Sequence, residues 1–224
     1  IHPNMGTMLC FITTDAAVSG EMLEKALKKN VKTTFNRVSV DGDTSTNDMV
    51  VVLANGLAGN PEITQDNDSF RVFKSALRKL MQGLAIEIAR DGEGASRLLT
   101  VTVTGACCEQ KAETLAKSVV CSSLLKAAMF GQDANWGRVI CAMGYSGADF
   151  DPDQVDIAFA SQKGEVEVCR RGRGLVFDED LAAEILSCDA VDILISLQEG
   201  NGSATCWGCD LTYDYVKING DYRT

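Results

Sequence analysis

The residues best suited to chemistry lie at the start of the chain, where Thr7 follows Gly6 at the entrance to an apolar segment. A threonine hydroxyl can attack the preceding carbonyl in an N-to-O acyl shift, and Gly6 has no Cβ to obstruct the attack. Once the bond breaks, Thr7 carries an α-amine with a reference pKa of about 7.7 to 8.0, which can serve as its base. This matters because His2 is the one histidine in the chain, so a Ser-His-Asp or Cys-His arrangement is disfavoured. A Gly-Thr pair before a strand is also a common structural feature, and both interpretations stay open.

A second candidate is Glu93, in the turn Asp91-Gly92-Glu93-Gly94. The glycines allow a ligand to approach closely, and a turn between a helix and a strand is a common place for a functional side chain. A glutamate at the end of a helix is more often a solvated turn residue. Residue type and spacing alone therefore favour the solvated turn.

Acidic residues alternate in the loop from Asp41 to Asp48, as they do in a calcium loop. The sixth and twelfth positions of an EF-hand need Gly and Glu, but here they are Thr46 and Val52. Asp, Asn and Thr side chains bond their own backbone, which favours a capped scaffold turn. An alternative is that the loop orients a polar substrate.

Two further segments contain residues that suit a site. Asp133–Arg138 combines Trp, Arg and Asn, which suits an interface anchor or the edge of a ligand site. Cys206 and Cys209 have C-x-x-C spacing, but no second pair or histidine cluster completes a tetrahedral zinc site. We therefore expect no metal and interpret the pair as buried free thiols. Nine cysteines, an odd number, suit a reduced intracellular setting.

Composition places the chain among ordinary globular proteins. Its 224 residues are 46% hydrophobic and 23% charged, which excludes disordered and low-complexity classes. The net charge of −10 repels phosphate backbones and anionic lipid surfaces, so we expect no nucleic-acid partner. The longest unbroken apolar run, Met49–Ala54, is far shorter than a membrane helix, so we expect no membrane association. Because the chain opens with Ile1 rather than Met, we expect it to be a piece of a longer gene product.

Alternating helices and strands predict an α/β fold with layered architecture. The predicted strands are Met8–Thr14, Met49–Ala54, Leu98–Thr104, Val139–Met143, Val155–Phe159, Val166–Cys169, Val191–Leu197 and the stretch Thr205–Ile218. The predicted helices follow Ser19 and end at Asn30, and cover Ser69–Arg90, Lys111–Met129 and Asp178–Leu186. Pro152 is the best candidate for an internal boundary.

Long segments of the chain together resemble the ornithine acetyltransferase (glutamate N-acetyltransferase) family of arginine biosynthesis. These segments are IHPNMGTMLCFITTDA, FNRVSVDGDTSTNDMVVVLANG, DGEGASR, DANWGR, ATCWGCDLTYDYVKIN and the closing YRT. The resemblance covers essentially the whole chain, and its motifs are long, ordered and correctly spaced. It raises the expectation for Thr7 and Glu93 above what their residue types alone support.

The resemblance implies a role for five residues. The precursor would cleave itself between Gly6 and Thr7, and Thr7 would then take the acetyl group from N-acetylornithine and pass it to glutamate. Glu93 aligns with a substrate-binding glutamate, whose carboxylate can pair with the ornithine ammonium. Asn219 and Thr224 align with a substrate-binding asparagine and a terminal hydroxyl residue.

The resemblance also implies the setting in which this chain works. It would be the β chain, requiring the α chain of the same precursor in an α2β2 heterotetramer, with a layered α-β-β-α sandwich-like arrangement shared between the chains and a smaller C-terminal α/β portion. Residues 1–6 would precede the cut, 7–150 would carry the nucleophile, and 151–224 would complete the substrate site. We expect no cofactor, with acetyl-CoA as acetyl donor in a bifunctional member. The location would be cytoplasmic in a bacterium and the mitochondrial matrix in a eukaryote.

Two other functions remain as alternatives. An amidase or aminopeptidase would use the same N-terminal threonine but give the acyl group to water. A structural domain would contain an ordinary Gly-Thr turn with no chemistry.

Overall fold

The structure is a computed structural model that describes residues 8–43, 45 and 47–221. Gly6, Thr7 and Thr224 therefore lie outside the described residues. The chain divides into two compact units, unit 1 from residues 1–38 and 42–87 and unit 2 from residues 39–41 and 88–224. Pro152 lies within unit 2, because strands on both sides of it join one sheet.

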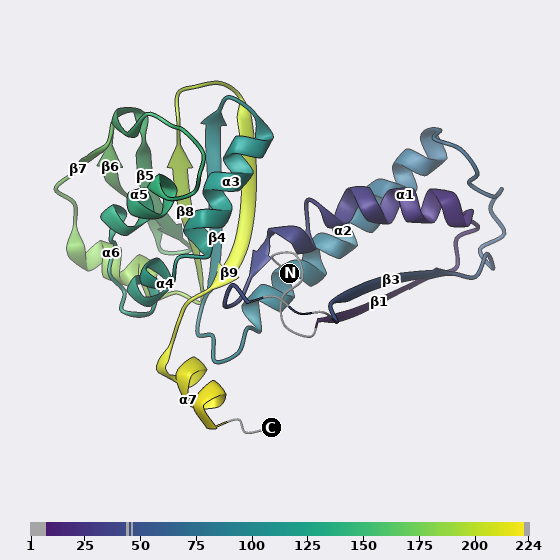
Figure 1. The fold of residues 1–224 in the computed structure, drawn as a ribbon, viewed down its shortest axis with the longest axis horizontal. Coiled ribbons are helices and arrows are strands. Elements are labelled where there is room, and N and C mark those ends of the chain that lie inside the picture. The colour runs from purple at the N-terminus through teal and green to yellow at the C-terminus, as the bar shows by residue number, and fades with distance from the viewer. Residues whose placement is uncertain (1–7, 44, 46, 222–224) are drawn as a thin grey trace. The chain divides into compact units, whose positions relative to one another are not determined.

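Unit 1 contains a two-stranded parallel sheet and two long helices, labelled in Figure 1. Its elements are β1 (Leu9–Thr14), α1 (Gly20–Val31), a 3-10 turn (Phe35–Arg37), β3 (Met49–Ala54) and α2 (Asp68–Arg90), the last residues of which enter unit 2. Ser19 caps α1 by accepting a hydrogen bond from Met22 N, as its residue type predicts.

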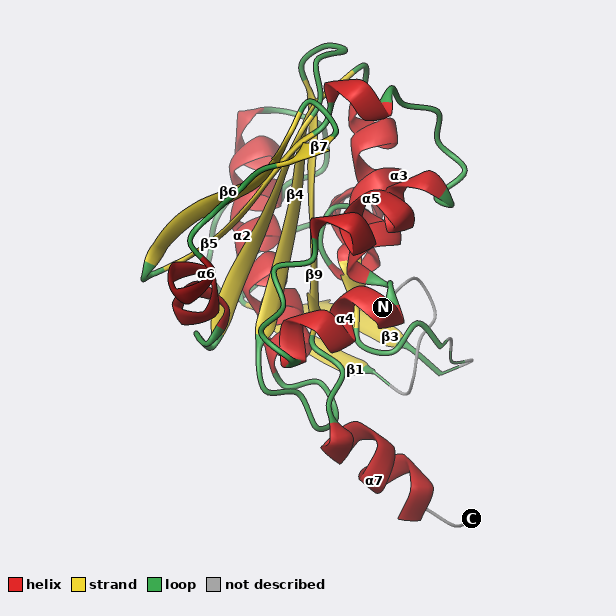
Figure 2. Cartoon of the chain, turned by 90° about the vertical axis from the view of Figure 1, so that its left-hand side faces the viewer, coloured by secondary structure: helices red, strands yellow, loops and turns green. Residues whose placement is uncertain are grey.

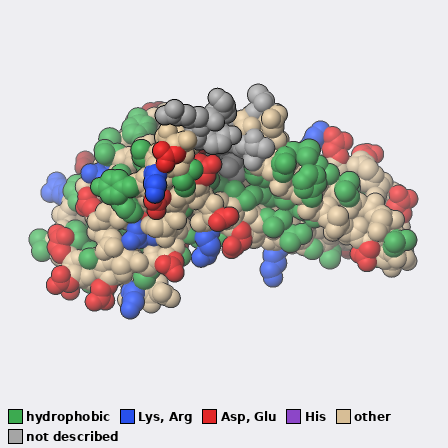
Figure 3. All heavy atoms as spheres, turned by 90° about the horizontal axis from the view of Figure 1, so that it is seen from below, with side chains coloured by type: hydrophobic (Ala, Val, Ile, Leu, Met, Phe, Trp, Pro, Cys, Tyr) green, Lys and Arg blue, Asp and Glu red, His purple; other side chains and the backbone are tan. Residues whose placement is uncertain are grey.

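Alternation along β1 divides the side chains of unit 1 between its core and its surface. Cys10 and Ile12 are buried, whereas Leu9 is 56% exposed and Phe11 is 61% exposed. Leu53 of β3, 56% exposed, adds to the apolar surface, and Figure 3 shows hydrophobic side chains gathered on this side of the unit. The parallel pair therefore has one packed face and one uncovered apolar face.

Unit 2 is built on a mixed sheet of seven strands in the order β2-β9-β4-β8-β5-β6-β7. The strands are β2 (Val38–Ser39), β4 (Leu98–Ala106), β5 (Asp156–Ser161), β6 (Gly164–Arg170), β7 (Arg173–Gly174), β8 (Ala190–Ser196) and β9 (Gly202–Cys209). β4 runs parallel to β8 and antiparallel to β9, with Leu98 opposite Cys209. The segment before β4 and the segment after β9 therefore leave the sheet side by side.

Helices cover one face of this sheet and enclose the main core. They are α3 (Glu109–Val120), α4 (Ser123–Phe130), α5 (Trp136–Gly144) and α6 (Glu179–Leu186), and the chain continues through a 3-10 turn (Pro152–Gln154) and α7 (Tyr213–Asp221). Figure 2 shows α3, α4 and α5 together along one side of the strands. Val101, Ile193 and Phe159, from three adjacent strands, are fully buried beneath them. The mixed α/β class predicted from the sequence is confirmed, with a multi-strand sheet flanked by helices.

Two predicted strands are wrong. Val139–Met143 lies in α5, where Asn135 accepts a hydrogen bond from Arg138 N and begins the helix. Val139, Ala142 and Met143 are buried at helical spacing, which a short apolar run does not distinguish from a strand. The stretch Thr205–Ile218 is a strand only to Cys209 and then becomes α7.

The helix predicted over Lys111–Met129 is two helices. Ser122 accepts a hydrogen bond from Leu125 N, which caps a new helix and separates α3 from α4. The other predicted elements agree with the structure to within a few residues at each end. Among the described residues, no helix combines the length and the apolar character needed to cross a membrane.

Candidate functional site

Two of the residues predicted to bind substrate meet in unit 2. Asn219, on α7, donates from Nδ2 to Oε2 of Glu93 at 3.0 Å, although the two lie 126 positions apart in the chain. The same Nδ2 donates to the carbonyl of Tyr215 at 3.0 Å, one turn earlier on α7. Both of its hydrogens are thereby used, and the side-chain amide is held in one orientation.

The turn that contains Glu93 fits closely against α7 because Gly94 has no side chain. Gly94 has φ +65°, and a Cβ there would lie 2.4 Å from Tyr215 N and 2.8 Å from the Asp214 carbonyl carbon. We expected the glycines of this turn to admit a ligand. The backbone of α7 occupies the space beside Gly94 instead, and this close packing brings Asn219 to Glu93.

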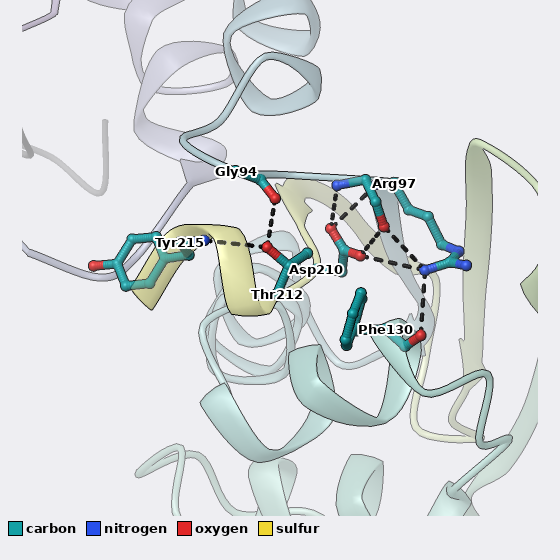
Figure 4. A network of polar contacts seen from close by, with 7 residues as sticks. Gly94, Arg97, Phe130, Asp210, Thr212 and Tyr215 are labelled. Atoms are coloured by element: carbon teal, nitrogen blue, oxygen red, sulfur yellow. Dashed lines mark hydrogen bonds and ion pairs between the residues drawn. The ribbon is translucent and has the colours of Figure 1, made fainter. Parts of the chain in front are cut away.

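Thr212 connects the same turn to the first residues of α7, as Figure 4 shows. Its Oγ1 donates to the carbonyl of Gly94 at 2.6 Å and accepts from Tyr215 N at 3.2 Å. The hydroxyl therefore begins the helix in the manner of an N-cap and fixes it to the turn. Thr212 is buried, whereas no residue of α7 itself is buried. Polar contacts thus hold α7 more than apolar packing does.

Asp210 is the residue in this region that the sequence analysis missed. Its side chain is 0% exposed. Its Oδ1 accepts from Ser96 N at 2.8 Å and from Arg97 N at 3.1 Å, and its Oδ2 forms an ion pair with Arg97 at 3.3 Å (Figure 4). The hydroxyl of Ser96 also bonds Oδ2. Asp210 thereby fixes the segment before β4 to the segment after β9, where pairing of the two strands has already brought them together.

Two more contacts hold α7. The hydroxyl of Tyr215 lies 3.1 Å from Oδ2 of Asp41, at the start of the acidic loop. The ring of Tyr213 meets the ring of Phe130 edge-on, with centroids 5.4 Å apart. Tyr215 and Asn219 are four residues apart and so share one side of α7. One side of the helix therefore faces two carboxylates, those of Asp41 and Glu93.

The arrangement suits a ligand that carries an ammonium group. Glu93 and Asn219 are exposed, so a ligand can reach them without unfolding the turn. The Glu93 carboxylate can accept from an ammonium in a charge-assisted hydrogen bond, and the side-chain oxygen of Asn219 is a second acceptor for it. A hollow of about 350 Å³ in unit 2 lies elsewhere, on the sheet face lined by Thr102, Asp156, Glu165 and Ser196. None of its lining residues belongs to the predicted site.

Several of the remaining candidate residues are buried, begin a helix or pack against the core. Cys206 and Cys209 are free and buried in β9, as predicted, and burial raises the pKa of the Cys209 thiol. Asn135 begins α5, and Trp136 packs against the core and closely against Gly174. The described residues contain no group of three or more Cys, His, Asp or Glu side chains suited to a metal ion.

The chain belongs to the ArgJ family, which its sequence matches over residues 1–224. This membership confirms the family predicted from the motifs. The Arginine biosynthesis bifunctional protein ArgJ 1 of Clostridium acetobutylicum is 54% identical over 224 residues, covering 100% of this chain and 55% of that protein. The corresponding protein of Thermotoga neapolitana is 52% identical, covering 100% and 56%. The chain thus spans about half the length of these curated relatives.

A solved structure supports the fold. The crystal structure of the arginine biosynthesis bifunctional protein ArgJ of Bacillus halodurans matches with a TM-score of 0.90 and 47% sequence identity. The match covers 96% of this chain and 100% of the crystallised chain. The described elements therefore follow an architecture seen experimentally in a family member.

Proposed function

We propose that this chain is part of an acetyltransferase of arginine biosynthesis that moves an acetyl group from N-acetylornithine to glutamate. The observation that carries the proposal is the hydrogen bond between Asn219 and Glu93. These two residues were selected by family resemblance as substrate-binding, and they are brought together by the packing of α7 on the turn before β4. The names of the relatives, which place them in arginine biosynthesis, support the same activity.

In the proposed cycle, Thr7 becomes the first residue of its chain when the Gly6–Thr7 bond breaks. Its hydroxyl attacks the acetyl carbonyl of N-acetylornithine, the carbon–nitrogen bond breaks, and ornithine leaves with the proton that the α-amine of Thr7 has taken up. The α-amine of glutamate then attacks the threonine ester, which forms the new amide and restores the hydroxyl. Glu93 and Asn219 bind the amino-acid substrate, with Thr224 as a third contact.

The proposed partner is an α chain from the same precursor, assembled with this chain as α2β2. Two observations support a partner of this kind. The chain covers 55% of the length of a close relative, and β1 and β3 leave an apolar surface that includes Leu9, Phe11 and Leu53 uncovered. The relatives are called bifunctional, which favours a second activity. Acetylation of glutamate with acetyl-CoA as donor is our proposal for it, and no resident cofactor is needed.

The test uses the full-length gene product, with N-acetylornithine and with or without glutamate. We expect acetylglutamate to form with glutamate present and little acetate to form without it. Thr7→Ala should abolish both chain cleavage and acetyl transfer, whereas Thr13→Ala, an exposed threonine in β1, should leave both unchanged. Release of acetate at the same rate without glutamate would favour the amidase alternative. Unchanged cleavage and activity in Thr7→Ala would favour the structural alternative.

A further inference from the structure

Met8, the residue that follows Thr7, is held at both of its backbone groups. Its N–H donates to Oδ1 of Asp48 at 2.9 Å, and its carbonyl accepts from Met49 N at 2.8 Å. Its side chain is buried, at 8% exposed. The start of β1 is therefore fixed by a residue 40 positions away in the chain.

Asp48 extends the pairing of β1 and β3 by one residue. The parallel register begins with Leu9 opposite Met49 and continues with Cys10 opposite Val50. Met8 precedes the first of these pairs, and a side-chain carboxylate rather than a strand carbonyl accepts its N–H. The acidic loop from Asp41 to Asp48 lacks the ligand spacing of a calcium site, and its last residue fixes the start of β1.

We propose that Asp48 is a positioning residue for the threonine nucleophile, an inference that rests on the proposed function. The peptide unit that joins Thr7 to Met8 is planar and rigid, so a hydrogen bond at Met8 N restrains that unit as a whole. Attack on an acetyl carbonyl, like attack on the Gly6 carbonyl, needs the hydroxyl at a defined distance and direction. Asp48 contacts the backbone N–H of Met8, and through this contact it acts on the chemistry by position.

Asn60 provides a matched control in the same unit. Its Oδ1 accepts from Ala17 N at 2.9 Å, and its Nδ2 donates to the carbonyl of Ala17 at 3.1 Å. These bonds join residues 43 positions apart, as the Asp48 bond joins residues 40 apart. Loss of either side chain removes a long-range link to the backbone. Of the two, only loss of Asp48 removes a hydrogen bond from the residue next to Thr7.

The test compares the full-length protein with its variants Asp48→Ala, Asp48→Glu, Asp48→Asn and Asn60→Ala. Cleavage at Gly6–Thr7 is followed by mass spectrometry, acetyl transfer by kcat and KM, and folding by melting temperature. Asp48→Ala should slow cleavage and lower kcat roughly 10- to 100-fold, with KM near the wild-type value because Glu93 and Asn219 are untouched. Asp48→Asn keeps an acceptor oxygen in place and should recover most of the rate.

Asp48→Glu keeps the charge but moves the acceptor oxygen by one methylene, so cleavage and acetyl transfer should both be slow in this variant. It provides the test if Asp48→Ala fails to fold. Asn60→Ala should lower the melting temperature and leave kcat unchanged. The inference is overturned if Asp48→Glu matches the wild type, if Asp48→Asn is as slow as Asp48→Ala, or if Asn60→Ala lowers kcat equally. A wild-type protein that neither cleaves nor transfers acetyl would overturn the proposed function and this inference with it. A wild-type protein that does both, with the Asp48 variants unimpaired, would overturn this inference alone.

Discussion

Substitution of Gly94 by alanine tests whether close packing of α7 builds the Glu93–Asn219 pair. A Cβ at Gly94 would lie 2.4 Å from Tyr215 N, whereas ordinary contacts begin at 3.4 Å. The first turn of α7 must therefore move away by about 1 Å, the difference between a clash and van der Waals contact. Because no residue of α7 is buried, the helix is free to make this movement without unfolding unit 2.

The expected loss of stability in Gly94→Ala has two parts. A left-handed alanine costs roughly 1 to 2 kcal/mol in any setting. Displacement of α7 adds about 1 kcal/mol for each hydrogen bond that fails, and the bonds at risk are Thr212 to Gly94 and Asn219 to Glu93. The effect on activity should be larger than the effect on stability, because a misplacement of about 1 Å costs on the order of 100-fold in rate.

Gly147→Ala is the matched control. Gly147 lies in the same unit with φ +82°, but a Cβ there meets nothing within 4 Å. Urea unfolding and steady-state kinetics of both full-length variants separate backbone strain from displacement of α7. We expect a similar backbone cost in both and a loss of kcat/KM in Gly94→Ala alone. Equal stability and equal activity of the two variants would refute the claim that the space beside Gly94 positions Asn219.

Three further predictions concern residues in and near the site. Glu93→Gln should raise KM for N-acetylornithine roughly tenfold in steady-state kinetics, because a neutral amide replaces a charge-assisted partner of the ammonium; an unchanged KM would count against an ammonium at this position. Asp210→Ala should lower the free energy of urea unfolding by about 3 kcal/mol, because it leaves the largely buried Arg97 unpaired; a loss below about 1 kcal/mol would contradict this role. Burial raises the pKa of the Cys209 thiol, so the folded protein favours its protonated form. The stability that this contributes is complete below pH about 8.5, the reference pKa of a free thiol, and is lost as the pH rises through the pKa of the folded state. Cys209→Ala should flatten the fall of unfolding free energy above that pH, and an unchanged slope would show that another group causes it.

Rules that use only neighbouring residues predict many of the helices and strands of this fold. Ser19 predicted the start of α1 because a serine before an amphipathic segment caps the first turn. Met49–Ala54 is a strand with the predicted bounds, because a short apolar run between polar turns is typical of a buried strand. The strand prediction for the α5 segment was wrong because Val139, Ile140 and Cys141 suit a strand by residue type. The contacts of Val139 and Met143 that decide for a helix lie in the tertiary core.

The site was predictable only in part, for a physical reason. Glu93 and Asn219 were identified through family motifs, but their contact depends on antiparallel pairing of β4 and β9, which no local pattern reveals. Asp210 carries no local signal, since a single acidic residue after a strand is common on protein surfaces. Its burial follows from Ser96 and Arg97, more than 100 positions earlier in the chain. Contacts of this range come from topology rather than from neighbouring residues.

The central claim is that Thr7, freed at the end of its chain, carries the acetyl group between the two substrates. The most direct measurement is the intact mass of the full-length gene product before and after exposure to N-acetylornithine, and again after glutamate is added. We expect a fragment that begins at Thr7, gains one acetyl group with N-acetylornithine and loses it to glutamate. An uncleaved protein with full activity, or a cleaved fragment that never gains the acetyl group during turnover, would contradict the account.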